Sequence, residues 1–303
     1  FYAVDDFGYA WKTLYQAGEE EPLMQYVTGT PVSAVNPHYL RFTAKQAGQG
    51  FTNKAYDGIR LEKDHTYKVS FYARCVAYEG EWFQITVQRD GQIFAQAEVK
   101  AVKPVPYVPF CDLKIPMEVG YGTLNPDIEK IHQMDQSDKC RRNEWIKYEA
   151  VLTALDDVRG AQFAITLDAP GIVEFDLISM IPEDAVSGIF RKDLFEALQA
   201  IKPGFVRFPG GCIVEGISLD NRYYWKNTVG DVKDRRYIPN LWAFDDDWGK
   251  NDPMTKRPDA HYGQSFGLGF YEYFLLCELL GAKPLPVLNI GTACQFRSTE
   301  MVD

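Results

Sequence analysis

The hydrophobic residues of this chain change their period near residue 185, and that change limits the folds open to it. Before this point, short runs mostly alternate apolar and polar side chains and are rich in β-branched and aromatic residues, as half-buried strands are. Asp90-Gly91, between two such runs, is a two-residue hairpin signal. About eight strands with little helical period between them predict an antiparallel β-sandwich of jelly-roll type. The expected strands are residues 39–43, 58–61, 66–74, 83–88, 93–99, 146–152, 161–167 and 172–180.

After Pro182 the apolar residues recur at helical spacing. Residues 191–201 predict an amphipathic helix, and the FVRF of residues 205–208 predicts a short buried strand. Residues 270–280 and 284–290 repeat this order of helix and apolar strand. Helix, tight turn and apolar strand in succession are typical of a parallel sheet or barrel.

We therefore expect two domains, a β-sandwich over residues 1–185 and an α/β part over residues 186–303. The five prolines of residues 100–143 predict a long loop, with one helical turn near residues 127–132. A second long excursion, rich in aromatic residues and Asp, covers residues 212–269 and follows a predicted strand. In parallel α/β folds, the loops at the carboxyl ends of strands hold the functional site.

The excess of acidic side chains limits the classes of partner that we expect. The chain has 32 basic and 42 acidic side chains, a formal net charge of −10. Such a surface repels phosphate backbones and anionic lipids, so neither nucleic acid nor membrane is an expected partner. The longest apolar stretch, residues 270–291, contains Glu272, Glu278 and Lys283, so no transmembrane segment is predicted. Aromatic residues make up 14% of the chain, a composition compatible with stacking on sugar rings.

The cysteines predict neither a zinc site nor a disulfide framework. They lie at positions 75, 111, 140, 212, 277 and 294, with no C-x-x-C pair, and none of the four His has metal-ligand spacing. We expect no metal and no cofactor, and buried free thiols with disulfides as the alternative. No signal peptide is visible, and a start at Phe1 suggests a mature or trimmed product. The compartment stays open, with a secreted or periplasmic location favoured.

Several short sequence motifs occur in a specific order in the second half of the chain. FVRFPGGCIVEG at residues 205–216 is followed by DNRYYWKNTVG at 220–230, NLW at 240–242 and PVLNIG at 286–291. Together they resemble the α-L-arabinofuranosidases of glycoside hydrolase family 51, over roughly residues 186–300. The resemblance implies that residues 205–208 form the second strand, and PVLNIG the third, of a (β/α)8 TIM barrel.

The same resemblance implies a role for the first half. Larger family members have a jelly-roll domain, similar to galactose-binding-like carbohydrate-binding modules, inserted between the first two barrel strands. NPHYLRF, TYKVSFYAR, WIKYEAVLT and VEFDLISMIPED resemble that insert. Residues 186–303 number 118, against about 250 for a closed barrel, so the barrel is expected to be incomplete.

The implied activity is release of terminal α-L-arabinofuranose from plant polysaccharides such as arabinan or arabinoxylan by a retaining mechanism. In the family, two Glu residues that follow the fourth and seventh strands do the chemistry. We expect both to be absent from this chain, and the chain alone to be inactive. Glu215 and the acidic run Asp245 to Asp247 are better interpreted as loop residues than as a local catalytic pair. Glu272 and Glu278 are expected on the solvent face of their helix.

Five residues are candidate substrate-binding residues. Arg207 lies in a predicted interior strand, where a charge needs a partner, and the resemblance implies that it steadies the nucleophilic Glu. Gly211 ends a turn that lets backbone N–H groups approach a ligand. The family counterpart of Cys212 contacts arabinose, with an inert thiol as the alternative. Trp242 is expected to stack on a sugar or to pack beneath its loop, and Asn289 to bind ligand or to cap a turn.

A rival interpretation is a non-catalytic carbohydrate-binding protein that uses the sandwich. Trp11, Tyr39, Tyr56 and Trp82 could form its glycan platform, and Trp225 could instead frame the α/β pocket. Both interpretations take an arabinose-containing polysaccharide or oligosaccharide as partner. Family members are commonly oligomeric, so a homo-oligomer is possible, although no interface can be identified from the sequence.

Overall fold

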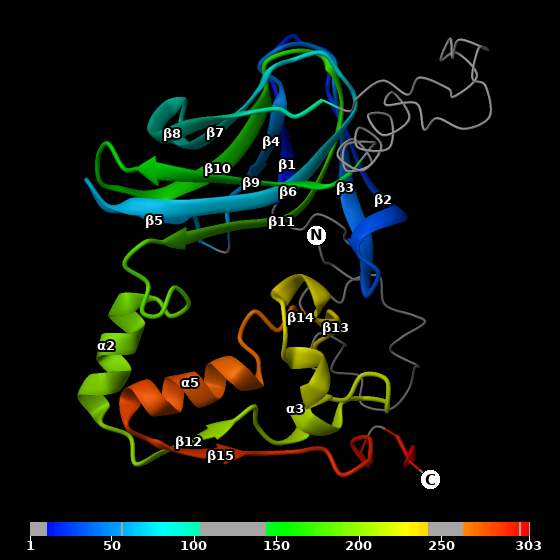
Figure 1. Cartoon of the computed structure of the whole chain (residues 1–303), viewed down its shortest axis with the longest axis vertical. Helices are drawn as coiled ribbons and strands as arrows, with labels where there is room; N and C mark the ends of the chain where they lie inside the picture. The colour runs from blue at the N-terminus through cyan, green and yellow to red at the C-terminus, as the bar shows by residue number, and fades with distance from the viewer. Residues whose placement is uncertain (1–10, 56, 104–143, 242–262, 297, 303) are drawn as a thin grey trace, which may run out of the picture.

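A computed structural model describes residues 11–55, 57–103, 144–241, 263–296 and 298–302. Two β-sheets form the upper part of the molecule in Figure 1, and the elements after residue 185 lie below them. None of the described helices is both long and apolar enough to cross a membrane.

The upper part consists of two antiparallel sheets, which confirm the predicted antiparallel sandwich. In the first, β1 (Trp11–Leu14), β4 (Gly50–Asn53), β10 (Val158–Leu167), β7 (Trp82–Arg89) and β8 (Gln92–Lys100) are neighbours in that order, and β5 (Ile59–Leu61) also pairs with β10. In the second the order is β2 (Leu23–Ser33), β3 (Asn36–Ala44), β11 (Gly171–Pro182), β6 (Thr66–Tyr78) and β9 (Ile146–Thr153).

Every predicted strand of this half is present, and three further strands are not predicted. β2 contains Gly29 and Pro31, residues that are depleted in strands. β1 and β4 are each only four residues long. Short strands with no clear alternation give too little periodic signal to be recognised.

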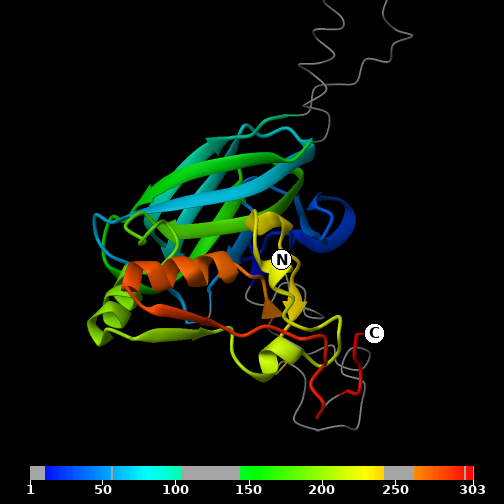
Figure 2. The same ribbon diagram turned by 60° about the horizontal axis from the view of Figure 1, so that its bottom comes forward.

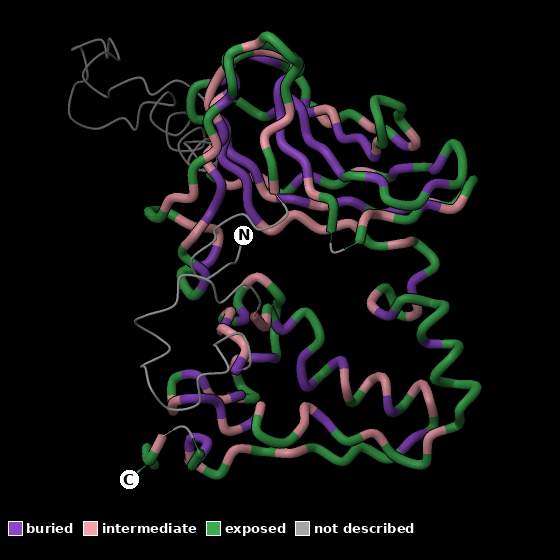
Figure 3. The backbone as a smooth tube through the Cα atoms, turned by 180° about the vertical axis from the view of Figure 1, so that it is seen from behind, coloured by how far each residue is buried: buried purple, intermediate pink, exposed green. Residues whose placement is uncertain are grey.

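The core lies between the sheets because alternate residues of each strand face inward. Five phenylalanines are fully buried there. The pairs of these rings that are in contact have centroids 5.0–6.1 Å apart. Edge-to-face and tilted pairs at these separations add to the burial of apolar area. These residues are Phe42, Phe51, Phe71, Phe83 and Phe175. Figure 3 shows the buried backbone concentrated in this half.

The second half confirms the predicted order of helices and strands. α2 (Lys192–Ile201) precedes β12 (Phe205–Phe208), and α5 (Phe270–Leu280) precedes β15 (Lys283–Pro286). β12 and β15 pair in parallel, with Phe208 opposite Pro286. The last strand is shorter than predicted. Within the described residues the parallel sheet has these two strands, so a parallel α/β arrangement is shown and a closed barrel is not.

α5 covers one face of this parallel pair. Phe208 packs against Phe270, Tyr273 and Phe274, with ring centroids 5.0–5.4 Å away. The other face stays open, since Phe205 is 61% exposed. α2 buries only Phe195 of its predicted apolar face.

The long excursion after β12, residues 212–269, contacts both α5 and the sandwich. It contains α3 (Cys212–Glu215), η3 (Trp225–Thr228), η4 (Val232–Asp234) and the small ladder of β13 (Ile238–Pro239) with β14 (Gly263–Gln264). Figure 2 shows this yellow segment next to α5 below the sandwich.

Asn36, at the tight β2–β3 turn, fastens the excursion to the sandwich. Its side-chain amide donates to the carbonyls of Lys233 (3.0 Å) and Arg235 (2.9 Å). Its side-chain oxygen accepts from the Tyr237 N–H (3.1 Å). Because this asparagine is buried, these three bonds satisfy groups that water does not reach.

The prediction that Glu272 lies on a solvent face is wrong. It is buried and forms a two-pronged ion pair with Arg235, at 2.8 and 2.9 Å. It also accepts the Gly269 N–H at 2.7 Å, the reach-back bond of a capping box. Burial acts to raise the pKa of Glu272, but the Arg235 and backbone hydrogen bonds outweigh it, and the pKa is lowered. Glu278 is exposed, as predicted.

Candidate active site at the ends of two parallel strands

A concavity of about 380 Å³ lies at the carboxyl ends of β12 and β15. α3 forms one wall, and the chain that follows β15 forms the other. This is the edge at which parallel α/β folds place their sites. The lining residues are Gly211, Cys212, Val214, Glu215, Val287, Leu288, Asn289, Ile290 and Thr292. Three predicted site residues, Gly211, Cys212 and Asn289, are therefore brought together.

Arg207 does not have the buried, paired environment that we predicted. Its side chain is exposed, and no ion pair to it is found among the described residues. It shares the open face of the parallel pair with Leu285, its neighbour in register. The face is open because no further strand stands opposite it in the described part of the chain. One guanidinium nitrogen lies 4.0 Å from the position that a Cβ on Gly211 would occupy, so the charge is beside the glycine turn.

The Pro209-Gly210-Gly211 turn leads the chain from β12 directly into α3. Gly210 has a φ of 151°, a conformation that residues with a Cβ rarely adopt. A Cβ at this position would also lie 3.0 Å from Ile213. The turn leaves Cys212, the first residue of α3, exposed at the rim of the concavity.

Asn289 caps a turn, one of its two predicted alternatives. Its amide group donates to the carbonyls of Val214 (2.9 Å) and Thr292 (2.8 Å), and its oxygen accepts the Gly291 N–H (2.7 Å). Both protons of the Asn289 side-chain amide are therefore donated to backbone carbonyls of the protein itself. The residue ties α3 to the chain after β15, so it holds the two walls of the concavity together.

Three residues in this region were not predicted to act together. The ligand atoms of Cys212, Glu215 and Cys294 all lie within 4.8 Å of one another. The Cys294 thiol is buried. Burial raises the pKa of this thiol, and the neighbouring Glu215 carboxylate raises it further. The sequence signal is weak, since Cys294 is distant in the chain and only the C-x-x-E spacing of Cys212 and Glu215 is local.

The other candidate residues of the α/β half do not line this concavity among the described residues. Trp242 and the acidic run Asp245 to Asp247 lie outside the described residues. Trp225 packs against Phe270, with ring centroids 6.2 Å apart, and lines a different, apolar concavity of about 600 Å³ on α5. It therefore does not frame the pocket at the strand ends.

The sandwich aromatics do not form one platform. Trp11 packs on the core ring of Phe51, with centroids 5.5 Å apart. Tyr39 belongs to the other sheet and is buried under Trp145. Trp82 is exposed at the start of β7, and Tyr56 lies outside the described residues.

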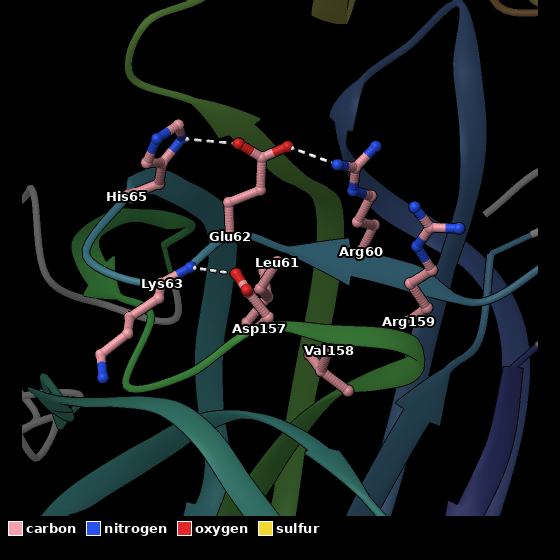
Figure 4. A pocket seen from close by; sticks show the side chains of 8 residues that line it. All are labelled: Arg60, Leu61, Glu62, Lys63, His65, Asp157, Val158 and Arg159. Carbon is pink, nitrogen blue, oxygen red and sulfur yellow. Dashed lines mark hydrogen bonds and ion pairs between the residues drawn. The ribbon is translucent and has the colours of Figure 1, made fainter.

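A charged concavity of the sandwich also lacks Trp, Tyr and Phe among its lining residues. It has a volume of about 590 Å³ beside β5 and the start of β10. Figure 4 shows Glu62 between His65 and Arg60, at 3.6 and 2.8 Å, with Arg159 next to Arg60. These groups are exposed to solvent, and such pairs contribute little to stability.

The cysteine prediction is largely confirmed within the described residues. Cys75, Cys212, Cys277 and Cys294 are free thiols, and all but Cys212 are buried. Cys111 and Cys140 lie outside the described part of the chain.

Comparison with known proteins gives consistent matches. The family model described as "Alpha-L-arabinofuranosidase 1 domain" matches residues 197–302. α-L-Arabinofuranosidase 2 of Arabidopsis thaliana is 38% identical over 246 residues, which are 80% of this chain and 28% of that protein. The extracellular exo-α-L-arabinofuranosidase of Streptomyces chartreusis is 36% identical over 166 residues, 50% of this chain and 18% of that protein.

A solved structure extends the match to both halves. The arabinose-bound MgGH51 α-L-arabinofuranosidase superposes with a TM-score of 0.71 at 21% identity, covering 97% of this chain and 39% of that one. The two proteins thus share a fold over nearly all of this chain. The chain spans less than a third of the length of these curated relatives.

Proposed function

Because this chain belongs to the α-L-arabinofuranosidases of glycoside hydrolase family 51, we propose that it forms the first part of a retaining glycosidase that releases terminal α-L-arabinofuranose from arabinan or arabinoxylan. The observation that supports this most directly is the concavity at the ends of β12 and β15, where Gly211, Cys212 and Asn289 meet. Its place in the fold is the place at which barrel enzymes bind substrate.

In this proposal the two halves have separate tasks. Residues 1–185 are a carbohydrate-binding-module-like jelly-roll, and residues 186–303 are the first portion of a (β/α)8 catalytic barrel. The open face of β12 and β15 is then the barrel interior, which later strands would cover. The name of the Streptomyces relative supports secretion, which we include in the proposal.

The proposed roles follow from the position of each group. The Arg207 guanidinium, beside the glycine turn, would hold a carboxylate from a later strand in its ionised form. Cys212 would contact the sugar from the rim of the pocket, and Trp242 would stack on it. Gly211 would allow close approach of the sugar to the backbone. Asn289 would act as a positioning residue, since its amide protons bind the backbone.

Such a pocket lacks the groups for bond cleavage. A retaining glycosidase needs two carboxyl groups about 5–5.5 Å apart, one acid and one nucleophile. The carboxylate lining this concavity belongs to Glu215, which lies beside the Cys294 thiol. We therefore propose that the acid/base and nucleophilic Glu residues belong to later parts of the polypeptide.

The test compares the 303-residue chain with a longer polypeptide that continues past Asp303. Hydrolysis of an aryl α-L-arabinofuranoside is expected only for the longer protein, and NMR of the first product should show the anomeric configuration of the substrate. In the longer protein, Arg207→Ala should lower kcat by at least about 100-fold, the scale of a lost electrostatic group. Activity of the 303-residue chain, abolished by Arg207→Ala, would contradict the proposed division of catalytic groups.

The rival carbohydrate-binding function has no platform to support it among the described residues. Calorimetric titration of the chain with arabino-oligosaccharides tests it directly. Binding that survives Cys212→Ala but is lost in Trp82→Ala would move the working site to the sandwich.

A further inference from the structure

The cluster of Cys212, Glu215 and Cys294 has the composition of a metal site. Two sulfur atoms and one carboxylate oxygen lie within 4.8 Å of one another at the edge of the concavity. Zinc prefers Cys sulfur, His nitrogen and carboxylate oxygen, at about 2.3 Å for sulfur and about 2.0–2.2 Å for oxygen. In a tetrahedral site these bond lengths place two sulfurs about 3.8 Å apart, so the ligand atoms would close by about 1 Å or less.

The backbone around the cluster holds the ligands on two separate segments. Cys212 and Glu215 are three residues apart on the single turn of α3, so both side chains point to the same side. The Cys294 N–H donates to the Gly216 carbonyl at 3.1 Å, which fixes Cys294 against the end of α3. Asn289 joins the same two segments through the Val214 carbonyl. The ligands are therefore positioned by contacts independent of any ion.

From this arrangement we infer that Cys212, Glu215 and Cys294 form a binding site for a thiophilic divalent cation, with Zn²⁺ as the ion that fits best. Each thiol gives its proton to solvent as its sulfur binds the metal. Three protein ligands leave the fourth position of a tetrahedral ion open, as in zinc sites that bind water or substrate. Because Cys212 is exposed and lines the concavity together with Glu215, an ion would be reached from the concavity.

The sequence could not indicate this site. Its two thiols come from the loops that follow different strands, and C-x-x-E is not a recognised zinc spacing. The inference does not depend on the proposed glycosidase activity, because it concerns binding of the metal alone.

The experiment titrates the reduced 303-residue chain with Zn²⁺ by calorimetry, and with Co²⁺ by absorption spectroscopy. We expect one equivalent of metal per chain, release of protons on binding, and a thiolate-to-cobalt charge-transfer band. Cys212→Ser and Cys294→Ser should abolish the band, and Glu215→Gln should weaken the affinity at least about tenfold, as loss of groups around a metal does. The double variant Cys111→Ser/Cys140→Ser is the matched control and should bind as the parent does.

The Cys212→Ser variant keeps the test clear of misfolding, since Cys212 is exposed. The circular dichroism spectrum of the metal-free variant should match that of the parent. Three results would overturn the inference: no binding to the reduced chain, binding unchanged in Cys212→Ser, or binding lost in the Cys111→Ser/Cys140→Ser control. A disulfide between Cys212 and Cys294 that persists in reductant would overturn it as well.

Discussion

The two halves of the molecule bury their strands to different extents. In the sandwich, two sheets cover each other, and residues such as Phe83 and Phe175 are 0% exposed. The parallel pair of β12 and β15 has α5 on one face and nothing described on the other, so Phe205 is 61% and Leu285 48% exposed. A sandwich closes its own core, whereas two βα units supply only one wall of a barrel.

The same contrast appears in the arginines of the two halves. Arg74, on β6, is buried and binds Glu174, Tyr39 and Thr30, with its guanidinium 4.6 Å from the centre of the Trp145 ring. Arg207, on β12, is exposed on the open face. A buried guanidinium must have its partners within the fold, while an exposed one keeps its hydration until a partner arrives.

Removal of a core ring from the sandwich should have the largest effect. Phe83→Ala deletes a fully buried ring that contacts Phe71, Tyr78, Tyr148 and Phe175. We expect the free energy of unfolding to fall by about 3–5 kcal/mol in denaturant titrations. Phe205→Ala, on the open face, should change it by less than about 0.5 kcal/mol. Equal losses in the two variants would show that the two halves do not differ in closure.

In the α/β half, the buried Arg235–Glu272 ion pair is a contact of comparable weight. Glu272→Ala leaves Arg235 charged and buried without its carboxylate, and should cost about 3–5 kcal/mol of unfolding free energy. Glu278→Ala, in the same helix but exposed, is the control and should stay within about 0.5 kcal/mol. The comparison is made by denaturant titration with a probe in the α/β half. Similar small effects would mean that the Arg235–Glu272 pair is exchangeable with water.

The same pair predicts a pH dependence. Its hydrogen bonds lower the pKa of Glu272 below that of the unfolded chain, so the folded state favours the ionised form. The resulting stability is complete above the ordinary carboxyl pKa and is lost as the pH falls through the lowered value. The difference in melting temperature between the parent and Glu272→Gln should therefore shrink in acid. A difference that grows on acidification would contradict the direction of this pKa shift.

A moderate effect is expected where the halves meet. Asn36→Ala removes three hydrogen bonds to residues 233–237 and leaves buried backbone groups unpaired, at a cost of about 1–3 kcal/mol. Limited proteolysis should cut the variant faster in residues 231–237. Gln25→Ala, exposed on the neighbouring strand β2, should leave the rate of cleavage unchanged. Unchanged cleavage in Asn36→Ala would indicate that other contacts, such as the Ser33–Asp234 hydrogen bond and the packing on α5, hold the excursion.

Period and turn chemistry were enough to predict eight strands of the sandwich and the order of helices and strands in the α/β half, but not β1, β2 and β4. They failed where a residue acts through a distant partner. Glu272 has the spacing of a surface helix residue, and only the fold brings Arg235 to it. Cys294 and Glu215 meet only because β12 and β15 are neighbours. The predicted burial of Arg207 followed from its place in an apolar strand, but the described residues supply two parallel strands and leave that face open.

The smallest expected effect separates folding from function at Arg207. In the 303-residue chain, Arg207→Gln should change the free energy of unfolding by less than about 0.5 kcal/mol, because the side chain is exposed and forms no ion pair with the described residues. Arg74→Gln provides the contrast, since it leaves the buried Glu174 with Arg41 as its remaining charged partner and should cost about 1–3 kcal/mol. In a polypeptide that continues past Asp303, Arg207→Gln should also become costly if later strands bring a carboxylate to this face. A cost that is equally small in the longer protein would mean that no carboxylate reaches Arg207, and its proposed role would be lost.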